Sequence, residues 1–299
     1  MRCPTLSELP PPLPGKTGWP WSEQSPLAPD MMPDGSPWPR ITIVTPSYNQ
    51  SEFIEETIRS VLLQGYPDLE YIIMDGGSTD GSVEIIHRYE SWLSHLHIGP
   101  DGGQAAALVE GFGRATGEIL AWLNSDDRYR PAALRRVASF FTSRRGVVFG
   151  NGDVNYIDHE GRFLQRIWAL RPSRFITSNL GAHCWPQQGC FWRHSAYTQV
   201  GGIESSLRFC MDRDLFIRLA GIGRGRRIPG SPLADFRIHD QAKSSTILDV
   251  ARQEGEALLA KYGSPYVRPR KHLLRFLWWC WRQPNRLRGK LHRYLEWEV

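Results

Sequence analysis

The chain lacks long hydrophobic runs and has few cysteines. Its longest apolar stretch, Phe276 to Trp281, is far below the roughly 18 residues that a membrane-spanning helix needs. We therefore predict no transmembrane segment, and no run of the kind that a signal peptide needs is present. The five cysteines are far apart and odd in number, with no Cys-x-x-Cys pair, which argues against a zinc site and a disulfide scaffold. We expect a protein of the reducing cytoplasm.

Proline is concentrated at one end of the chain. Residues 1–40 hold 11 of the 22 prolines and few apolar clusters. That composition predicts a disordered or loosely extended N-terminal segment. The rest of the 299 residues can bury a substantial core, so we predict one large domain over residues 41–262.

The positive charge is concentrated at the other end. Residues 264–299 contain nine Lys or Arg and two Asp or Glu, a net charge of +7. Because the whole chain carries +5, the remainder carries −2. We predict a basic, Trp-rich helical tail over residues 263–299, distinct from the domain.

Strand-like and helix-like patterns alternate through the first half of the domain. Short apolar runs at 41–45, 69–74, 96–98 and 118–123 read as strands, and helical spacing of apolar residues fills the intervals. Ser51 is the expected N-cap of the first helix. This alternation predicts an α/β fold with a mostly parallel, Rossmann-like sheet and flanking helices. The second half is less regular, with strand-like pieces, a helix near 212–220 and a strand near 234–238.

Each of the first four strands ends in a loop rich in Gly, Asp, Asn or Ser. In open α/β sheets, ligands bind at the carboxyl ends of the strands, so these loops should converge on one crevice. Asp126 and Asp127 in one of them suit a hard divalent ion such as Mg²⁺ or Mn²⁺. The alternative for this pair alone is an ordinary turn before Pro131.

Four motifs together resemble glycosyltransferase family 2, whose members have the GT-A fold. They are Ile41-Thr-Ile-Val-Thr-Pro-Ser-Tyr-Asn49, Asp75-Gly-Gly-Ser-Thr-Asp80-Gly, Ala115-Thr-Gly-Glu-Ile-Leu-Ala-Trp-Leu-Asn-Ser-Asp-Asp127 and Met211-Asp-Arg-Asp-Leu215. The resemblance covers about 220 residues, in the family's order and spacing. It implies an inverting transfer of a sugar from a nucleotide-sugar donor. The processive synthases' Gln-x-x-Arg-Trp motif is absent, so we expect a single sugar, with a UDP-hexose as the first guess.

The resemblance also implies roles for individual residues. The donor would contact Thr45, Pro46, Tyr48, Asp75, Asp101 and Asp126. An aromatic ring can stack on a base, and a carboxylate can accept hydrogen bonds from a base or ribose. The alternatives without donor binding are a half-buried loop aromatic for Tyr48 and a turn-forming Asp for Asp75.

The acidic motifs imply the metal site and the catalytic base. Asn124 stands where the family often has Asp, so the resemblance implies the metal on Asp127, with His239 as a second ligand. Asp212 would be the base that takes the acceptor's proton. The alternative for Asp212 and Asp214 is a helix cap, a role we assign to Asp214.

The tail leaves three hypotheses open. Its arginines and tryptophans are compatible with an anionic membrane surface, with a helix packed on the domain, or with a non-catalytic nucleic-acid-binding protein. We expect a glycan or lipid-linked acceptor and no specific nucleic acid. A non-catalytic nucleotide-sugar-binding protein is the other alternative. The expected location is the cytoplasm, with peripheral docking on the inner face of the membrane.

Overall fold

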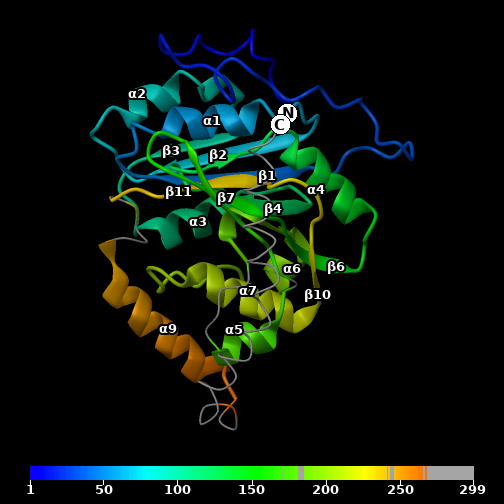
Figure 1. The fold of residues 1–299 in the computed structure, drawn as a ribbon, viewed down its shortest axis with the longest axis vertical. Helices are drawn as coiled ribbons and strands as arrows, with labels where there is room; N and C mark the ends of the chain where they lie inside the picture. Colours follow the sequence, from blue (N-terminus) through cyan, green and yellow to red (C-terminus); the bar gives the residue numbers. More distant parts are fainter. Residues whose placement is uncertain (171, 181–184, 241, 243–245, 265–266, 268–299) are drawn as a thin grey trace, which may run out of the picture.

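The protein is built around a large, mostly parallel sheet. A computed structural model describes residues 1–170, 172–180, 185–240, 242, 246–264 and 267, and Figure 1 shows the arrangement of its elements. The strand order in this sheet is β10-β6-β9-β4-β1-β2-β3. Its strands are β1 (Ile41–Ser47), β2 (Leu69–Asp75), β3 (His95–Ile98), β4 (Ile119–Trp122), β6 (Val147–Asn151), β9 (Cys190–Arg193) and β10 (Arg224–Arg227).

The first four strands pair as the sequence predicts. β1 lies between β2 and β4 in parallel pairs, and β3 extends the same set. Helices α1 (Ile54–Leu62), α2 (Ser82–His87) and α3 (Gln104–Gly113) fill the connections that parallel strands require. The N-cap prediction is wrong in detail: Phe53 precedes α1 without a side-chain cap, and Ser51 donates its backbone N–H to Asp80.

The second half adds the remaining strands and a smaller sheet. β9 pairs antiparallel with β4 and β6, and β10 forms the outer edge beside β6. The small sheet has the order β5-β11-β7-β8. The elements not yet named are β5 (Arg128–Tyr129), β7 (Val154–Ile157), β8 (Phe163–Ile167), β11 (Ala234–Arg237), α4 (Ala133–Thr142), α5 (Arg174–Leu180), α6 (His194–Gln199), α7 (Met211–Ile222), α9 (Leu248–Tyr262) and the short 3-10 helices Glu90–Trp92 and Gln187–Gly189.

Helices cover both faces of the large sheet, and each face has its own apolar core. Ile41, Ile43 and Ile73 face a core shared with α1 and α4. Val44 and Ile72 face the opposite core, shared with α3 and α7. The alternation of neighbouring strand residues between the two cores is the period-two pattern of a strand covered on both faces. Figure 1 shows α1 and α2 on one side of the strands and α3 and α7 on the other.

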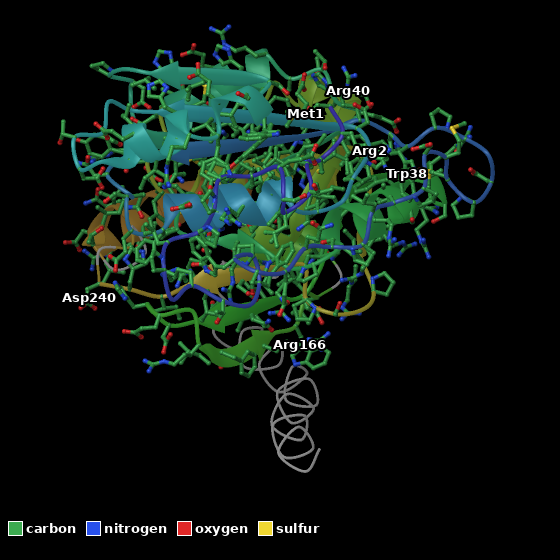
Figure 2. All side chains as sticks on the ribbon, turned by 90° about the horizontal axis from the view of Figure 1, so that it is seen from above. Met1, Arg2, Trp38, Arg40, Arg166 and Asp240 are labelled. Carbon is green, nitrogen blue, oxygen red and sulfur yellow. The ribbon has the colours of Figure 1, made fainter. Side chains whose placement is uncertain are left out.

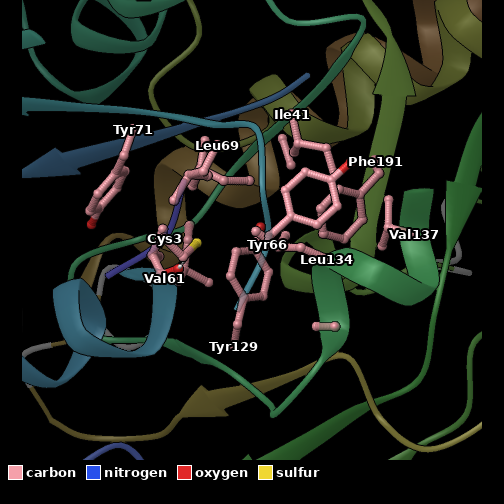
Figure 3. Close-up of a cluster of buried hydrophobic side chains, with 14 of the residues drawn as sticks. Cys3, Ile41, Val61, Tyr66, Leu69, Tyr71, Tyr129, Leu134, Val137 and Phe191 are labelled. Carbon is pink, nitrogen blue, oxygen red and sulfur yellow. Dashed lines mark hydrogen bonds between the residues drawn. The ribbon is translucent and has the colours of Figure 1, made fainter. Parts of the chain in front are cut away.

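The N-terminal segment, residues 1–40, packs on the first core instead of standing free. Its backbone is irregular with several turns, the backbone N–H of Cys3 donates to the Tyr66 carbonyl, and the Trp38 and Tyr66 rings meet edge to face at 5.7 Å. Cys3 lies within the buried cluster of Figure 3. The amino group of Met1 and the guanidinium of Arg40 both approach Asp68, so both ends of the segment return to one place (Figure 2). Single buried apolar residues such as Cys3 and Trp38 hold this segment on the domain, although its composition alone predicts disorder.

The C-terminal tail predicted over residues 263–299 lies almost entirely outside the described residues, as do Cys184 and Cys280. The three cysteines that the structure describes, Cys3, Cys190 and Cys210, are buried and free. Among the described residues, no helix combines the length and apolar character needed to cross a membrane.

Candidate active site

A cavity of about 560 Å³ opens at the carboxyl end of the parallel strands. The loops after β1, β2, β3 and β4 all contribute to its wall, as the strand–loop pattern predicts. The lining residues are Pro46, Ser47, Tyr48, Gln50, Gly76, Pro100, Asp101, Gly103, Gln104, Ala107, Asn124, Ser125, Asp126 and Thr246. The cavity therefore combines an aromatic ring, backbone and amide groups, and two carboxylates.

The loop after β1 presents Pro46 and Tyr48 to this cavity. The Tyr48 side chain is 62% exposed, so one ring face is free to stack on a planar ligand. Thr45 behaves differently. It is fully buried, and its hydroxyl lies 3.2 Å from that of Tyr71. Its side chain therefore packs inside the domain and does not line the cavity.

Asp75 is engaged in its own turn. One carboxylate oxygen accepts the backbone N–H groups of Gly77 and Ser78, and the other accepts the Ser78 hydroxyl at 2.7 Å. The side chain is fully buried, and the wall at this point is formed by Gly76. The structure thus places Asp75 in the turn-forming role that the sequence offered as the alternative to donor binding.

Asp101 closes the same side of the cavity. Its carboxylate accepts the backbone N–H of Gly103 at 2.7 Å, and a Cβ on Gly76 would lie only 3.2 Å from its Oδ2. Glycine at position 76 lets this exposed carboxylate lie close to the backbone after β2. A negative group is thereby held in the same cavity wall as Tyr48 and Pro100.

The loop after β4 carries two adjacent acids whose side chains have different surroundings. Asp126 lines the cavity, whereas Asp127 is buried and is not among the residues that line it. Asp127 accepts three hydrogen bonds: from the Arg237 backbone N–H at 3.0 Å, from the Gln188 amide at 2.9 Å and from the Asn124 amide at 3.2 Å. The carboxylate that lines the cavity is therefore that of Asp126, whereas the sequence predicted Asp127 as the metal ligand.

Burial dominates the electrostatics of Asp127. Loss of hydration raises the pKa of Asp127 well above its usual range, and the nearby charge of Asp126 adds to the shift. The three donated hydrogen bonds oppose it. An amide at position 124 suits this environment, because Asn124 donates to Asp127, where an aspartate would place another carboxylate.

His239 lies against Asp126. Its Nε2 is 3.1 Å from Asp126 Oδ2, and its ring packs on Phe53 with centroids 4.9 Å apart. Groups of three or more His, Cys, Asp or Glu able to hold a metal are absent from the part of the chain that the structure describes. An aspartate and a histidine beside a cavity still fit a divalent ion, because Mg²⁺ and Mn²⁺ sites commonly take remaining ligands from substrate phosphates and water.

A buried ionic network holds the acidic loop from behind. Arg237, at the end of β11, donates to the Asp126 carbonyl at 3.0 Å and pairs with Glu56 of α1 at 2.6 Å. Arg128 also contacts Glu56, and it bonds Asp235 at 2.7 Å. Sequence reasoning missed this network, although an arginine within an otherwise buried strand was a usable signal.

A second cavity of about 160 Å³ adjoins the first and contains Asp212. It shares Gln104, Asn124 and Asp126 with the larger cavity. The other lining residues are amide, apolar and aromatic side chains, namely Trp122, Gln187, Gln188, Phe209, Met211, Phe236 and Ala242. Amides and aromatic faces are groups that recognise polar rings with apolar faces.

Asp212 stands in the first turn of α7, where the positive end of the helix dipole favours a negative charge. One of its oxygens accepts the backbone N–H of Arg213 at 2.6 Å. Asp214 does not cap the helix, contrary to the prediction. It is buried and bonds Arg218 and the Tyr262 hydroxyl, each at 2.7 Å.

Glu254 of α9 serves the start of α7 instead. Its carboxylate accepts the backbone N–H groups of Arg208, Phe209 and Cys210, at 2.7 to 2.9 Å. These donors belong to the loop just before Asp212. Helix α9 thus fixes the loop that leads into the second acidic motif. No local pattern in the sequence predicts this contact, because the two segments are more than 40 residues apart.

The architecture and the two acidic motifs define a GT-A fold. The family model described as "Glycosyl transferase family 2" matches residues 42–196, which is more than half of the chain. The chain belongs to glycosyltransferase family 2, and it spans less than two thirds of the length of the first curated relatives that it matches.

Known proteins agree with this assignment. Over 109 residues the chain is 37% identical to TuaG of Bacillus subtilis, whose name provisionally assigns it as a glycosyltransferase of teichuronic acid biosynthesis; the match covers 36% of this chain and 43% of that relative. The fold is similar to Staphylococcus aureus TarS 1–349 in complex with UDP-GlcNAc, with a TM-score of 0.56, 16% identity and coverage of 75% and 71%. It is also similar to the mannosyltransferase PcManGT of Pyrobaculum calidifontis in complex with GDP-Man and Mn²⁺, with a TM-score of 0.52, 19% identity and coverage of 74% and 62%.

Proposed function

We propose that the protein transfers a single sugar, with inversion, from a nucleotide-sugar donor to a hydroxyl acceptor in glycan or polysaccharide assembly. The observation that carries this proposal is the junction of the two cavities. Gln104, Asn124 and Asp126 line both, so a donor in the larger cavity would meet an acceptor in the smaller one at these residues.

The larger cavity would hold the nucleotide. The exposed ring of Tyr48 is available for stacking on the base, and Asp101 can accept hydrogen bonds from the base or ribose. A neighbour of the same fold is recorded with UDP-GlcNAc, and another with GDP-Man. UDP-hexoses are therefore the first donors to test, followed by GDP-sugars.

A divalent Mg²⁺ or Mn²⁺ ion would be held by Asp126 and His239. Asp127 would act indirectly, because its oxygens accept hydrogen bonds that fix the loop. When bound, such an ion supplies charge neutralisation for the leaving diphosphate. Arg237, paired with Glu56, donates to the Asp126 carbonyl. This contact would fix the backbone of Asp126 while its carboxylate holds the ion.

Asp212 would act as the general base. Its carboxylate would accept the proton of the acceptor hydroxyl as that oxygen attacks the anomeric carbon. Attack from the face opposite the leaving nucleotide inverts the anomeric configuration. Gln187, Gln188 and Trp122 would orient the acceptor sugar around this base.

The acceptor would be a glycan or a lipid-linked saccharide. This part of the proposal rests on the name of TuaG, on the amide and aromatic lining of the smaller cavity, and on the +7 charge of residues 264–299, which suits docking at the inner face of the membrane. The enzyme would then work in the cytoplasm as a peripheral membrane protein.

Donor binding tests the proposal most directly. Purified protein is titrated with UDP-, GDP- and dTDP-sugars in Mn²⁺ or in EDTA, and slow donor hydrolysis is followed by release of the nucleoside diphosphate. We expect one nucleotide class to bind only with the metal. Absence of binding to every donor in either buffer, together with salt-sensitive binding to DNA, would favour the nucleic-acid-binding alternative.

A further inference from the structure

The outer edge of the large sheet carries an arginine-lined pocket away from the active site. This pocket, of about 360 Å³, lies between the start of α5, the end of α7 and β10. Three of its residues are arginines: Arg174 at the start of α5, and Arg224 and Arg226 of β10. Pro172, Ala220, Gly223 and Gly225 complete the lining. No Asp or Glu occurs among the described residues that line it.

These three guanidinium groups have no salt bridge within the described part of the chain. Arg227 of the same strand shows the contrast, because it pairs with the buried Asp153 at 2.6 Å. Arg174 approaches the backbone of α7, where a Cβ on Gly221 would lie 3.1 Å from its Nη1. Three unneutralised cations around one hollow repel one another unless an anion lies between them. The pocket therefore suits a phosphate group.

Exposed apolar residues are neighbours of these pocket residues in the sequence. Phe175 follows Arg174 on α5 and is 52% exposed, and Ile222 lies between pocket residues at the end of α7 and is 39% exposed. A pocket that binds only free phosphate does not require exposed apolar side chains nearby. Cationic groups beside exposed aromatic and aliphatic side chains are the combination that binds the boundary between lipid headgroups and acyl chains.

We propose that this surface, formed by Arg174, Phe175, Ile222, Arg224 and Arg226, docks the folded domain on an anionic lipid bilayer. The pocket would hold the phosphate of a lipid headgroup, and Phe175 and Ile222 would enter the interfacial layer. The proposal concerns the body of the enzyme rather than its tail, and it does not depend on the transfer reaction.

A second arginine-rich pocket lies beside the end of β10, on the α4 side of the large sheet. It has a volume of about 520 Å³ and is bounded by Ile228 and Pro229, directly after β10. Arg135, Arg136 and Arg144 of the α4 region line it together with the apolar rings of Trp38 and Phe140. The two pockets border β10 from opposite faces of the sheet, so arginines lie on both sides of this edge.

The place where the basic tail begins supports docking through this surface. The backbone N–H of Ser264 donates to Asn179 at 2.7 Å, and Asn179 lies on α5, the helix that starts at Arg174. Residues 264–299, with their net charge of +7, thus begin at the helix that carries part of the docking surface. Charge on the tail and charge on the domain would act on one membrane together.

Vesicle sedimentation of the full chain tests this proposal. The variant Arg224→Gln/Arg226→Gln is compared with Arg114→Gln/Arg162→Gln, which removes the same charge from exposed side chains elsewhere. Each basic residue near an anionic surface contributes about fivefold in affinity, so the first pair should weaken binding to phosphatidylcholine–phosphatidylglycerol vesicles by roughly thirtyfold. The control pair should change it by no more than about threefold.

Further measurements separate the possible outcomes. Phe175→Ser should weaken vesicle binding without changing its salt dependence, since it removes no charge. Equal binding by the two double variants, or no binding of the wild type to anionic vesicles, would overturn the proposal. So would binding to soluble polyphosphate that Arg224→Gln/Arg226→Gln weakens while vesicle binding is unaffected. Donor binding, measured in parallel, should be unchanged in every variant.

Discussion

The imidazole of His239 lies 3.1 Å from the carboxylate of Asp126, which lines the larger cavity, although 113 residues separate them in the chain. Their contact joins the loop after β4 to the chain that follows β11. The next residue, Asp127, has its carboxylate bonded inside the domain. The two adjacent carboxylates thus have different surroundings, and substitutions can measure what each one contributes.

The first prediction distinguishes the two acids. Asp126→Ala should abolish Mn²⁺-dependent donor binding and leave stability nearly unchanged, because its carboxylate faces a cavity. Asp127→Ala should cost about 1–3 kcal/mol of unfolding free energy, because it leaves buried donors without an acceptor. Calorimetric donor titration and urea unfolding check both. Normal donor binding by Asp126→Ala, with binding lost in a stably folded Asp127→Ala, would restore the assignment made from sequence.

The second prediction concerns the base. Asp212→Asn should lower kcat by about 10²–10⁴-fold while the donor dissociation constant stays within about twofold, since the amide retains shape but cannot take a proton. Asp214→Asn serves as the matched control on the same helix. It should lower stability through the lost bonds to Arg218 and Tyr262, and it should retain far more turnover. Equal loss of turnover in both would remove Asp212 from the role of base.

The third prediction tests the network behind the acidic loop. Arg237→Met leaves Glu56 without one of its buried partners and frees the Asp126 carbonyl, which should cost about 3–5 kcal/mol. Arg130→Met removes a half-exposed guanidinium 3.6 Å from Asp235 and should cost no more than about 1 kcal/mol. Chemical denaturation compares the two. A small effect at Arg237 would mean that the loop is held by other contacts.

The fourth prediction uses Cys3 as a reporter of N-terminal packing. Burial raises the pKa of the Cys3 thiol to about 12, so the folded protein should show almost no thiolate at this residue at pH 8. Cys3 should then resist iodoacetamide, and its alkylation should rise only near pH 12 or on unfolding. Peptide mass spectrometry measures the rate. Rapid alkylation at pH 8 would show that the segment is not packed as described.

A single glycine offers the complementary change. Gly65 has φ of +60°, and a Cβ there would lie 2.6 Å from the Pro26 carbonyl oxygen. Gly65→Ala should therefore displace the N-terminal segment and accelerate Cys3 alkylation at pH 8. Gly113→Ala is the control, because nothing lies within 4 Å of a Cβ at that helical position.

The parallel half of the fold could be predicted from sequence because its signals are local. Each strand is a short run of β-branched and apolar residues, such as Ile41 to Thr45, followed by a polar loop and a helical repeat. Strands of this kind must carry their ligand loops at one edge, so Tyr48, Asp101 and Asp126 were found together.

The direction of individual side chains could not be predicted in the same way. At the end of a strand, neighbouring residues face opposite sides, and the turn after β4 decides which acid reaches the cavity. The partners that hold Asp127 inward, Gln188 and Arg237, come from 61 and 110 residues away. The packing of Cys3 and Trp38 was equally hidden, because isolated apolar residues among prolines give no periodic signal.

The bond from Glu254 to the loop before α7 has a consequence for how the enzyme is made. During synthesis, the parallel strands β1 to β4 and their loops leave the ribosome long before α9 does. Domains can fold as they emerge, so β1 to β4 can begin to pair on the nascent chain, while the loop leading to Asp212 must wait for Glu254. The last helix of the described domain therefore sets the moment at which the loop before Asp212 can gain the acceptor of its three backbone hydrogen bonds.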